Sequence, residues 1–228
     1  MTQIEAAKTT ESLAVAPTDD LRIVRSQSTY ERRFKRPVDA VGGLLILVVA
    51  SPVIIGIALA IRARLGQGVL YSQERVGAGE QPFTIYKFRT MQPDRRERQI
   101  EIDEVADRRA QHKHDNDPRH TRLGRLLRRF SLDELPQLIN VVRGEMSLVG
   151  PRPEVVAVAE KRGYLHHPRH QVKPGMTGPF QVSDLRLSGD LRDGLELDTE
   201  YTRSITFGSD LAYLFKTVSV MLWGASGS

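Results

Sequence analysis

Apolar residues concentrate in one long uncharged segment, whereas the rest of the chain mixes short apolar runs with charged stretches. Residues 40–61 carry no charge and are mostly apolar. As a helix they extend roughly 33 Å, enough to cross the hydrocarbon core of a bilayer. A buried core helix is the alternative, but a soluble helix of this length usually carries a polar stripe. The pattern therefore predicts a membrane helix.

Basic residues flank this segment on both sides, and a proline interrupts it. Residues 32–36 (RRFKR) precede it, and Arg62 and Arg64 follow, so the positive-inside rule does not orient a simple span. Ser51 and Pro52 lie at its middle, where the proline removes a backbone hydrogen bond and kinks a helix. These residues leave two arrangements open: a helix that spans the bilayer, and a re-entrant helix that returns to the same leaflet.

The remaining pattern divides the chain into three parts. Residues 1–29 are polar without apolar periodicity and are predicted to be a disordered tail, with no signal peptide. Residues 30–65 contain the membrane helix with its basic flanks. Residues 66–224 are predicted to form one small domain.

A β-hairpin is predicted near the start of this domain. Residues 69–73 and 83–89 alternate between apolar and polar positions and flank a glycine-containing turn. The alternation places Lys87 and Arg89 on one face. Phosphate binding and simple solvation both fit this cationic pair.

Helical periodicity dominates the rest of the domain. In residues 119–130, Arg122, Arg125 and Arg129 share a helix face. Such a basic amphipathic helix fits a membrane surface or a nucleic acid, and the neighbouring membrane segment favours the first.

Three further elements are predicted nearer the C-terminus. Residues 154–162 are predicted to form a short helix and residues 173–178 a tight turn. A last helix is expected to begin at an N-cap formed by Ser209 and Asp210, and its apolar face fits either core packing or contact with lipid. The predicted fold class is α+β, mostly helical, with a short β-hairpin and amphipathic interfacial helices.

Composition limits the chemistry. The formal net charge is +5 and the pI about 9.6, which indicates an anionic partner. Cysteine is absent, so disulfides and Cys-ligated metals are excluded. His112, His114 and His120 lack the i, i+4 spacing of a helical metal site, and the polarity of a loop explains them equally well.

The strongest candidate for chemistry is the acid pair Asp133 and Glu134, which follows a basic run. Ser131 and Glu134 have the spacing of a capping box, so the pair could serve only to cap a helix. Against this, Pro136 would delete a backbone bond of that helix.

The alternative interpretation is catalytic. A carboxylate can attack phosphorus, and a neighbouring carboxylate can bind Mg²⁺ together with substrate phosphates. Arg128 and Arg152 could then neutralise the phosphoryl group.

The chain resembles the bacterial sugar transferases, that is, the monotopic polyprenyl-phosphate phosphoglycosyl transferases, from about residue 33 to residue 223. The resemblance rests on the basic-flanked apolar helix with Ser-Pro and on four motifs: YKFRTM at 86–91, DPRHTRLGRLLRRFSLDELPQL at 117–138, NVVRGEMSLVGPRPE at 140–154 and KPGMTG at 173–178. Any one of these motifs is weak evidence, but their order along the chain is specific.

This resemblance implies transfer of a sugar-1-phosphate from a UDP-sugar to undecaprenyl phosphate, with release of UMP, as the first membrane step of surface glycan biosynthesis. It implies that Asp133 is the nucleophile, that Glu134 binds Mg²⁺, and that Arg128 and Arg152 bind phosphate. Lys87 and Arg89 of YKFRTM are expected to bind substrate phosphate as well.

The resemblance also implies a location and a topology. Ser51 and Pro52 would break a re-entrant helix in the cytoplasmic (inner) membrane, with the catalytic domain on the cytoplasmic face. Membrane lipids are expected partners, a homodimer is left open, and no nucleic acid is expected. The chain resembles a minimal catalytic form, without the multi-spanning region of longer members.

One segment departs from the family pattern. After KPGMTG the chain continues Pro179-Phe180-Gln181-Val182-Ser183-Asp184-Leu185-Arg186, where many members have a Gly-Arg pair. Gln181, Arg186 and the downstream Asp198 are the candidates for a nucleotide-sugar pocket. The departure affects the expected pocket and not the phosphoryl chemistry.

Two other functions remain open at this point. One is a membrane-anchored binding or scaffold protein with a basic surface and no catalysis. The other is a glycosyltransferase that moves the sugar alone and releases UDP.

Overall fold

The computed structural model describes residues 25–91, 121–187 and 194–223. The predictions for residues 1–24 and for the histidine-bearing charged segment 92–120 lie outside the described residues. The principal elements, in chain order, are η1 (Tyr30–Phe34), α1 (Lys35–Leu65), β1 (Leu70–Val76), β2 (Pro82–Phe88), α3 (Arg122–Arg129), η4 (Leu132–Gln137), α4 (Leu138–Arg143), β3 (Ser147–Val149), α5 (Val156–Lys161), β4 (Gly175–Thr177), α6 (Pro179–Val182), α7 (Leu195–Arg203) and α8 (Phe207–Trp223). The short 3-10 turns η2 (Ala78–Glu80), η5 (Pro168–Gln171) and η6 (Asp184–Leu187) connect them. The predicted α+β class, mostly helical, is confirmed.

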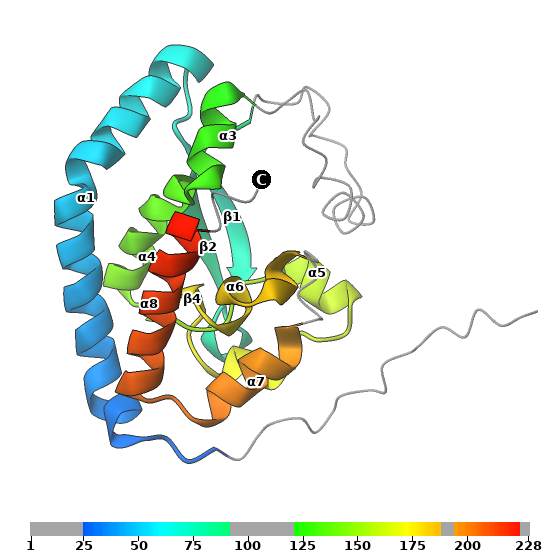
Figure 1. Cartoon of the computed structure of the whole chain (residues 1–228). Helices are drawn as coiled ribbons and strands as arrows, with labels where there is room; N and C mark the ends of the chain where they lie inside the picture. The colour runs from blue at the N-terminus through cyan, green and yellow to red at the C-terminus, as the bar shows by residue number, and fades with distance from the viewer. Residues whose placement is uncertain (1–24, 92–120, 188–193, 224–228) are drawn as a thin grey trace, which may run out of the picture.

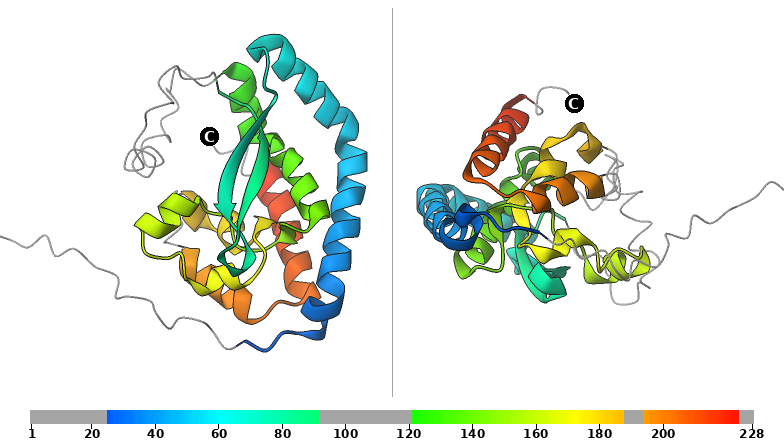
Figure 2. Two further views of the ribbon diagram at one scale, coloured as in Figure 1. Left: turned by 180° about the vertical axis from the view of Figure 1, so that it is seen from behind. Right: turned by 90° about the horizontal axis from the view of Figure 1, so that it is seen from below.

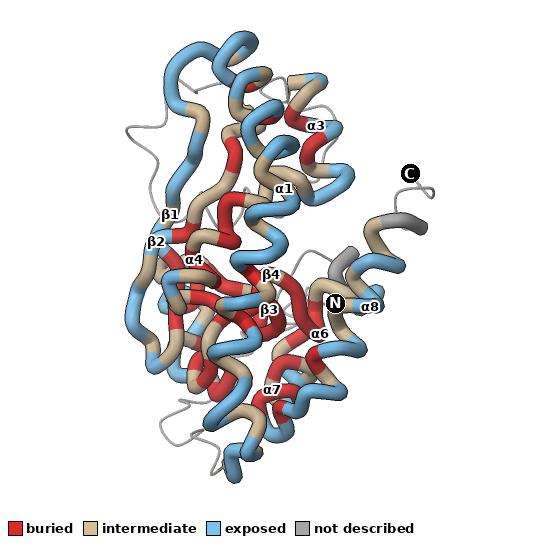
Figure 3. The backbone as a smooth tube through the Cα atoms, turned by 90° about the vertical axis from the view of Figure 1, so that its left-hand side faces the viewer, coloured by how far each residue is buried: buried red, intermediate tan, exposed pale blue. Residues whose placement is uncertain are grey.

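Helix α1 runs along one edge of the molecule (Figure 1). Only 11% of its most apolar 18-residue stretch is buried. Its outer face is exposed along most of its length (Figure 3). The exposed apolar residues include Val41, Leu44, Leu45, Val48, Val49, Val53, Ile55 and Leu59. A soluble core helix would bury such side chains, so the exposure fits a membrane anchor.

Pro52 lies inside α1 without ending it, and the ribbon bends partway along the helix (Figure 1). Proline has no N–H to donate to the carbonyl four residues earlier, which belongs to Val48. The hydroxyl of Ser51 donates to that same carbonyl over 2.7 Å. A serine hydroxyl of this kind satisfies a backbone group that proline has freed, which is what a helix surrounded by lipid requires.

Both halves of α1 contact the same small domain. In the first half, Arg36 donates to the carbonyls of Val141 (2.8 Å) and Val142 (2.7 Å), near the end of α4. In the second half, Ile57 and Ile61 pack in one apolar cluster. That cluster also contains Phe88 of β2 and Leu127 of α3. The domain is therefore attached to α1 on either side of Pro52.

The predicted hairpin is confirmed. Strands β1 and β2 pair antiparallel, with Tyr71 opposite Lys87, and they lie on the side of the molecule opposite α8 (Figures 1 and 2). The helix predicted for residues 154–162 is confirmed as α5, and the basic helix as α3.

The tight turn predicted for residues 173–178 is wrong in part, because Gly175–Thr177 form a strand. This strand, β4, pairs in parallel with β3 to give a second two-stranded sheet. The two strands are short and far apart in sequence, so no local alternation indicates them. Gly175 lies so close to the neighbouring loop that a Cβ there would be 2.1 Å from the nitrogen of Gly150. The glycines therefore permit the close backbone approach that this sheet needs.

The predicted N-cap of α8 is also wrong. The helix begins at Phe207, and Thr206 and Ser209 form reciprocal bonds between their side chains and each other's backbone N–H. Asp210 is buried instead, 2.6 Å from the ammonium of Lys35.

We call the group around this ion pair the buried clamp; it comprises Lys35, Asp210, Tyr30, Tyr201 and the carbonyl of Val149. Both tyrosine hydroxyls donate to the Asp210 carboxylate, over 3.0 Å from Tyr30 and 2.8 Å from Tyr201. Lys35 and Tyr201 also donate to the carbonyl of Val149, at 3.1 Å and 3.0 Å. The clamp joins α1, α7 and α8 to the end of β3.

Candidate active site

The acid pair lies on η4, a 3-10 turn that follows a strained residue. Ser131 has φ 53° and ψ 21°, the left-handed conformation, and its side chain makes no capping bond. The helix-cap interpretation of Ser131 and Glu134 is therefore wrong. Left-handed non-glycine residues cost free energy and persist where the surroundings require them, commonly at functional sites.

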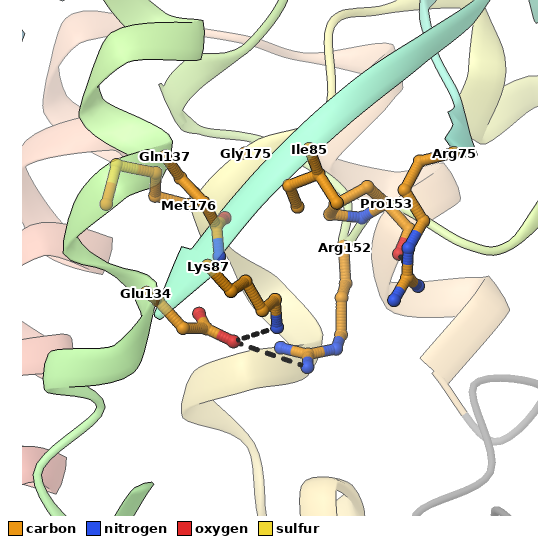
Figure 4. A pocket seen from close by; sticks show the side chains of 9 residues that line it. All are labelled: Arg75, Ile85, Lys87, Glu134, Gln137, Arg152, Pro153, Gly175 and Met176. Carbon is orange, nitrogen blue, oxygen red and sulfur yellow. Dashed lines mark hydrogen bonds and ion pairs between the residues drawn. The ribbon is translucent and has the colours of Figure 1, made fainter. Parts of the chain in front are cut away.

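Segment η4 has an apolar side and an acidic side. Leu132 and Leu135 pack against the cluster that contains Ile57 and Ile61 of α1. On the acidic side, Glu134 points toward β2 (Figure 4). The fold thus holds the acid pair between α1 and the hairpin.

Glu134 is the centre of a charged group. Its Oε1 lies 2.7 Å from Nζ of Lys87 and 3.7 Å from Nη2 of Arg152 (Figure 4). Burial on its own would raise the pKa of Glu134, but the charges of Lys87 and Arg152 outweigh it and lower the pKa to about 2. Glu134 is therefore ionised throughout the physiological range.

Asp133 is in the opposite electrostatic position. Burial raises its pKa above the usual value, and the negative charge of Glu134 raises it further, against smaller effects of Lys87 and Arg128. Two neighbouring carboxylates whose pKa values are shifted in opposite directions are typical of a site in which they have different roles.

A small polar pocket opens beside Glu134, and Asp133 is not among the residues that line it. It is lined by Arg75, Ile85, Lys87, Glu134, Gln137, Arg152, Pro153, Gly175 and Met176 (Figure 4). Lys87, Glu134 and Arg152 were predicted from the sequence, and the structure brings them together. Arg75 and Gln137 were not. The alternation of the hairpin could have indicated Arg75, because every second residue of a strand lies on the same face. Arg75 therefore shares a face of β1 with Tyr71, which pairs with Lys87.

Two buried arginines hold the backbone of the loop that carries Arg152. Nη1 of Arg75 donates to the carbonyl of Pro153 over 3.1 Å, and Arg169 donates to the carbonyl of Arg152. Arg169 in turn pairs with Asp198 over 2.9 Å, and neither side chain of this pair has any exposed surface.

This arrangement changes the interpretation of Asp198, which was expected to line a nucleotide-sugar pocket. Its carboxylate is fully buried in α7, and burial raises its pKa to about 6 against the opposing charge of Arg169. In this structure Asp198 contacts the loop through Arg169 and offers no surface to a ligand.

The other predicted cations are divided. Arg128 lies near the end of β2, with Nη1 3.5 Å from Oγ1 of Thr90, and its charge acts on Asp133. Arg89 does not reach the pocket. Its guanidinium donates to the carbonyl of Leu65 over 2.5 Å, so it caps the end of α1.

The remaining predicted pocket residues lie on α6 and η6. Both polar atoms of the Gln181 side-chain amide are buried without a hydrogen-bond partner among the described residues. Arg186 belongs to η6, and its side chain lies outside what the structure describes.

The carboxylates of the site can be compared with the ligands that Mg²⁺ prefers. Among the described residues no group of three or more His, Asp or Glu side chains could hold a metal ion. Mg²⁺ commonly uses one or two carboxylates and takes its other ligands from substrate phosphates and water. The two carboxylates of η4 fit an ion bound in this way.

Helix α1 exposes apolar side chains and packs on a small α+β domain, in which an acid pair lies among cations. These features define a class of proteins, in which an apolar anchor helix adjoins a polar site that suits a phosphorylated ligand. Within that class, residues 30–224 match the family model described as bacterial sugar transferase. The chain belongs to this family.

Similar proteins include enzymes with named substrates. The chain is 40% identical over 200 residues to the UDP-glucose:undecaprenyl-phosphate glucose-1-phosphate transferase of Escherichia coli K12, which covers 84% of this chain and 40% of that protein. It is 41% identical over 212 residues to the undecaprenyl-phosphate galactose phosphotransferase of Salmonella typhimurium, covering 89% and 43%.

A relative of more similar length is the uncharacterized sugar transferase EpsL of Bacillus subtilis, 36% identical over 189 residues, which cover 82% of this chain and 87% of that protein. The chain spans about two fifths of the length of the two relatives with named substrates.

Proposed function

We propose that the protein transfers a sugar-1-phosphate from a UDP-sugar to undecaprenyl phosphate, with a covalent intermediate on Asp133. The observation that carries this proposal is the position of η4, whose apolar side packs on α1 while Glu134, next to Asp133, faces Lys87 and Arg152. A lipid-linked phosphate and a soluble nucleotide-sugar can both reach a site so placed. The names of the relatives support the same two substrates.

In the first step, a carboxylate oxygen of Asp133 attacks the phosphorus that bears the sugar. A bond forms between that oxygen and phosphorus, and the bond from phosphorus to the bridging oxygen breaks, so UMP leaves with the bridging oxygen. The raised pKa of Asp133 makes its carboxylate more basic and hence a better nucleophile once it is ionised.

In the second step, a phosphate oxygen of undecaprenyl phosphate attacks the same phosphorus. The bond to Asp133 breaks, the carboxylate is regenerated, and the product is the lipid diphosphate sugar. No net proton transfer to the protein is required over the two steps.

The cations around Glu134 bind and orient the phosphates. Lys87 and Arg152 neutralise Glu134 in this structure, and Arg152 is 38% exposed on its side chain, so it can turn toward a ligand. Mg²⁺ held by Glu134 and the substrate would add a Lewis acid that offsets the charge of the diphosphate.

We also propose that α1 is re-entrant and that the domain lies on the cytoplasmic face. Arg36 ties the first half of α1 to α4, and Ile57 and Ile61 bind the second half to α3 and β2. If α1 spanned the bilayer, its two ends would face opposite aqueous phases, and one of these contacts would be lost. A bent helix with both halves on one domain needs only one leaflet.

The reaction is tested with purified full-length protein in detergent or nanodiscs, undecaprenyl phosphate, Mg²⁺ and a panel of UDP-sugars. Release of UMP with formation of lipid diphosphate sugar is the expected result. Release of UDP would indicate transfer of the sugar alone, and no product with any donor would favour a membrane-anchored binding protein.

The topology is tested with single cysteines, because the chain has none of its own. Ser26 and Gln67 are exposed and lie on either side of α1. Ser26→Cys and Gln67→Cys should both react with an impermeant maleimide only from the cytoplasmic side. Labelling of the two variants from opposite sides would mean a spanning helix.

A further inference from the structure

Gln137 stands out in the pocket because its side chain is buried and incompletely bonded. It has 2% relative exposure, yet its Nε2 has no hydrogen-bond partner among the described residues. Buried polar atoms in native proteins almost always have a partner, and an exception calls for an explanation such as a ligand. The amide end of Gln137 points toward Lys87 and Glu134 (Figure 4).

The surroundings indicate what Nε2 would bind. Gln137 is the last residue of η4, one turn after Glu134, and it directly precedes α4. It is therefore held on the same segment as the acid pair. The ammonium of Lys87 and the guanidinium of Arg152 already face the Glu134 carboxylate. A phosphoryl oxygen that entered this pocket could accept a hydrogen bond from Nε2 of Gln137, which has no acceptor among the described residues.

An amide also suits this position electrostatically. It donates a hydrogen bond without adding charge and does not titrate, so it leaves the opposed pKa shifts of Asp133 and Glu134 unchanged. A further cation there would draw Glu134 away from Lys87.

We propose that Gln137 is a substrate-binding residue whose Nε2 donates to a phosphoryl oxygen of the nucleotide-sugar. The inference rests on the proposed function and adds a residue and a contact to it. Because the contact is made in the substrate complex and not within the folded protein, its removal affects catalysis and stability in opposite directions.

The test is Gln137→Met, which keeps the length of the side chain and removes the polar atoms. We expect kcat/KM for UMP release to fall about 10- to 100-fold, the usual cost of losing one hydrogen bond to a charged group. The thermal midpoint of the ligand-free protein should stay unchanged or rise, because an unsatisfied buried amide has been replaced by an apolar group. Gln81→Met, at an exposed position in the hairpin turn, is the matched control and should change neither quantity.

Ligand-induced stabilisation gives a second readout that does not require turnover. Both UDP-glucose and UDP should raise the midpoint of the unchanged protein and of Gln81→Met, and raise that of Gln137→Met less. If only the UDP-glucose shift is reduced, the contact is to the sugar and the phosphoryl assignment is wrong.

Other outcomes would also overturn the inference. Activity of Gln137→Met within about twofold of the unchanged protein would mean that the amide does not bind substrate. A fall in midpoint that accounts for the lost activity would mean that Gln137 has a structural role. Absence of UMP release from the unchanged protein would contradict the proposed function, while the UDP shifts would still decide whether Gln137 binds phosphate.

Discussion

Two lysine–carboxylate pairs, one in the buried clamp and one in the pocket, have similar geometry and different surroundings. Lys35 and Asp210 lie 2.6 Å apart with side chains 11% and 7% exposed, and Lys87 and Glu134 lie 2.7 Å apart with 19% and 20% exposed. In the clamp, both Asp210 oxygens also accept tyrosine hydroxyls. In the pocket, by contrast, the charge of Lys87 acts on both Glu134 and Asp133, and Glu134 lies near the unsatisfied amide of Gln137.

The contrast shows that the distance within an ion pair says little about its role. A pair whose remaining oxygens are all satisfied by protein groups gains nothing from a ligand and serves to join elements. A pair whose side chains are about one-fifth exposed, beside a second carboxylate whose pKa is shifted in the opposite direction, retains capacity for a substrate. Substitutions in the two pairs should therefore separate catalysis from stability.

The largest effect is expected at the nucleophile. Asp133→Asn removes the attacking carboxylate, so UMP release should fall by more than about 1,000-fold, measured with a coupled assay. Membrane association and thermal midpoint should be close to normal. Near-normal turnover of this variant would refute the assignment of Asp133.

The next effect concerns the clamp. Lys35→Met leaves the buried Asp210 carboxylate without its cation, which should lower the free energy of unfolding by about 3 kcal/mol. Denaturation in detergent, followed by circular dichroism, measures this change. The pH dependence of UMP release by the folded protein should keep its shape, and a shifted profile would show that the clamp is part of the chemistry.

A smaller effect is expected for Glu134→Gln, which should lower kcat about 10- to 100-fold through weaker Mg²⁺ binding and loss of the contacts that position Lys87 and Arg152. Its pH profile is the more informative result. Activity requires ionised Asp133, so it declines on acidification through the raised pKa of that group. Since the Glu134 charge contributes to this raised pKa, its removal lowers the pKa, and the acid limb should move to lower pH. An unmoved limb in residual activity would mean that another group controls it.

Much of the fold follows from local patterns in the sequence. The uncharged run predicts α1, alternation predicts β1 and β2, and helical periodicity predicts α3 and α5. Strands β3 and β4 could not be predicted in this way, because two three-residue strands pair across a long separation. The start of α8 was predicted wrongly because aspartate is a common N-cap residue. Here, however, Asp210 forms an ion pair with Lys35, which is distant in sequence.

For the site, the sequence predicted the residues whose type suits phosphate chemistry. It could not show that Arg89 caps α1 or that Asp198 is buried against Arg169, because both depend on tertiary contacts. Nor could it distinguish Gln137 from an ordinary polar residue. That distinction depends on the absence of a partner among the described residues, which only coordinates show.

The carbonyl of Val149 connects the base of α1 to the loop that carries Arg152. This carbonyl accepts hydrogen bonds from Lys35, at the base of α1, and from Tyr201 of α7. Val149 directly precedes Gly150, where the loop that carries Arg152 begins. Whatever shifts the base of α1 within the lipid also shifts the start of that loop. By thermodynamic reciprocity, a substrate that fixes the loop must then strengthen the seating of the helix. With α1 embedded as proposed, the bilayer would act as an effector of the site.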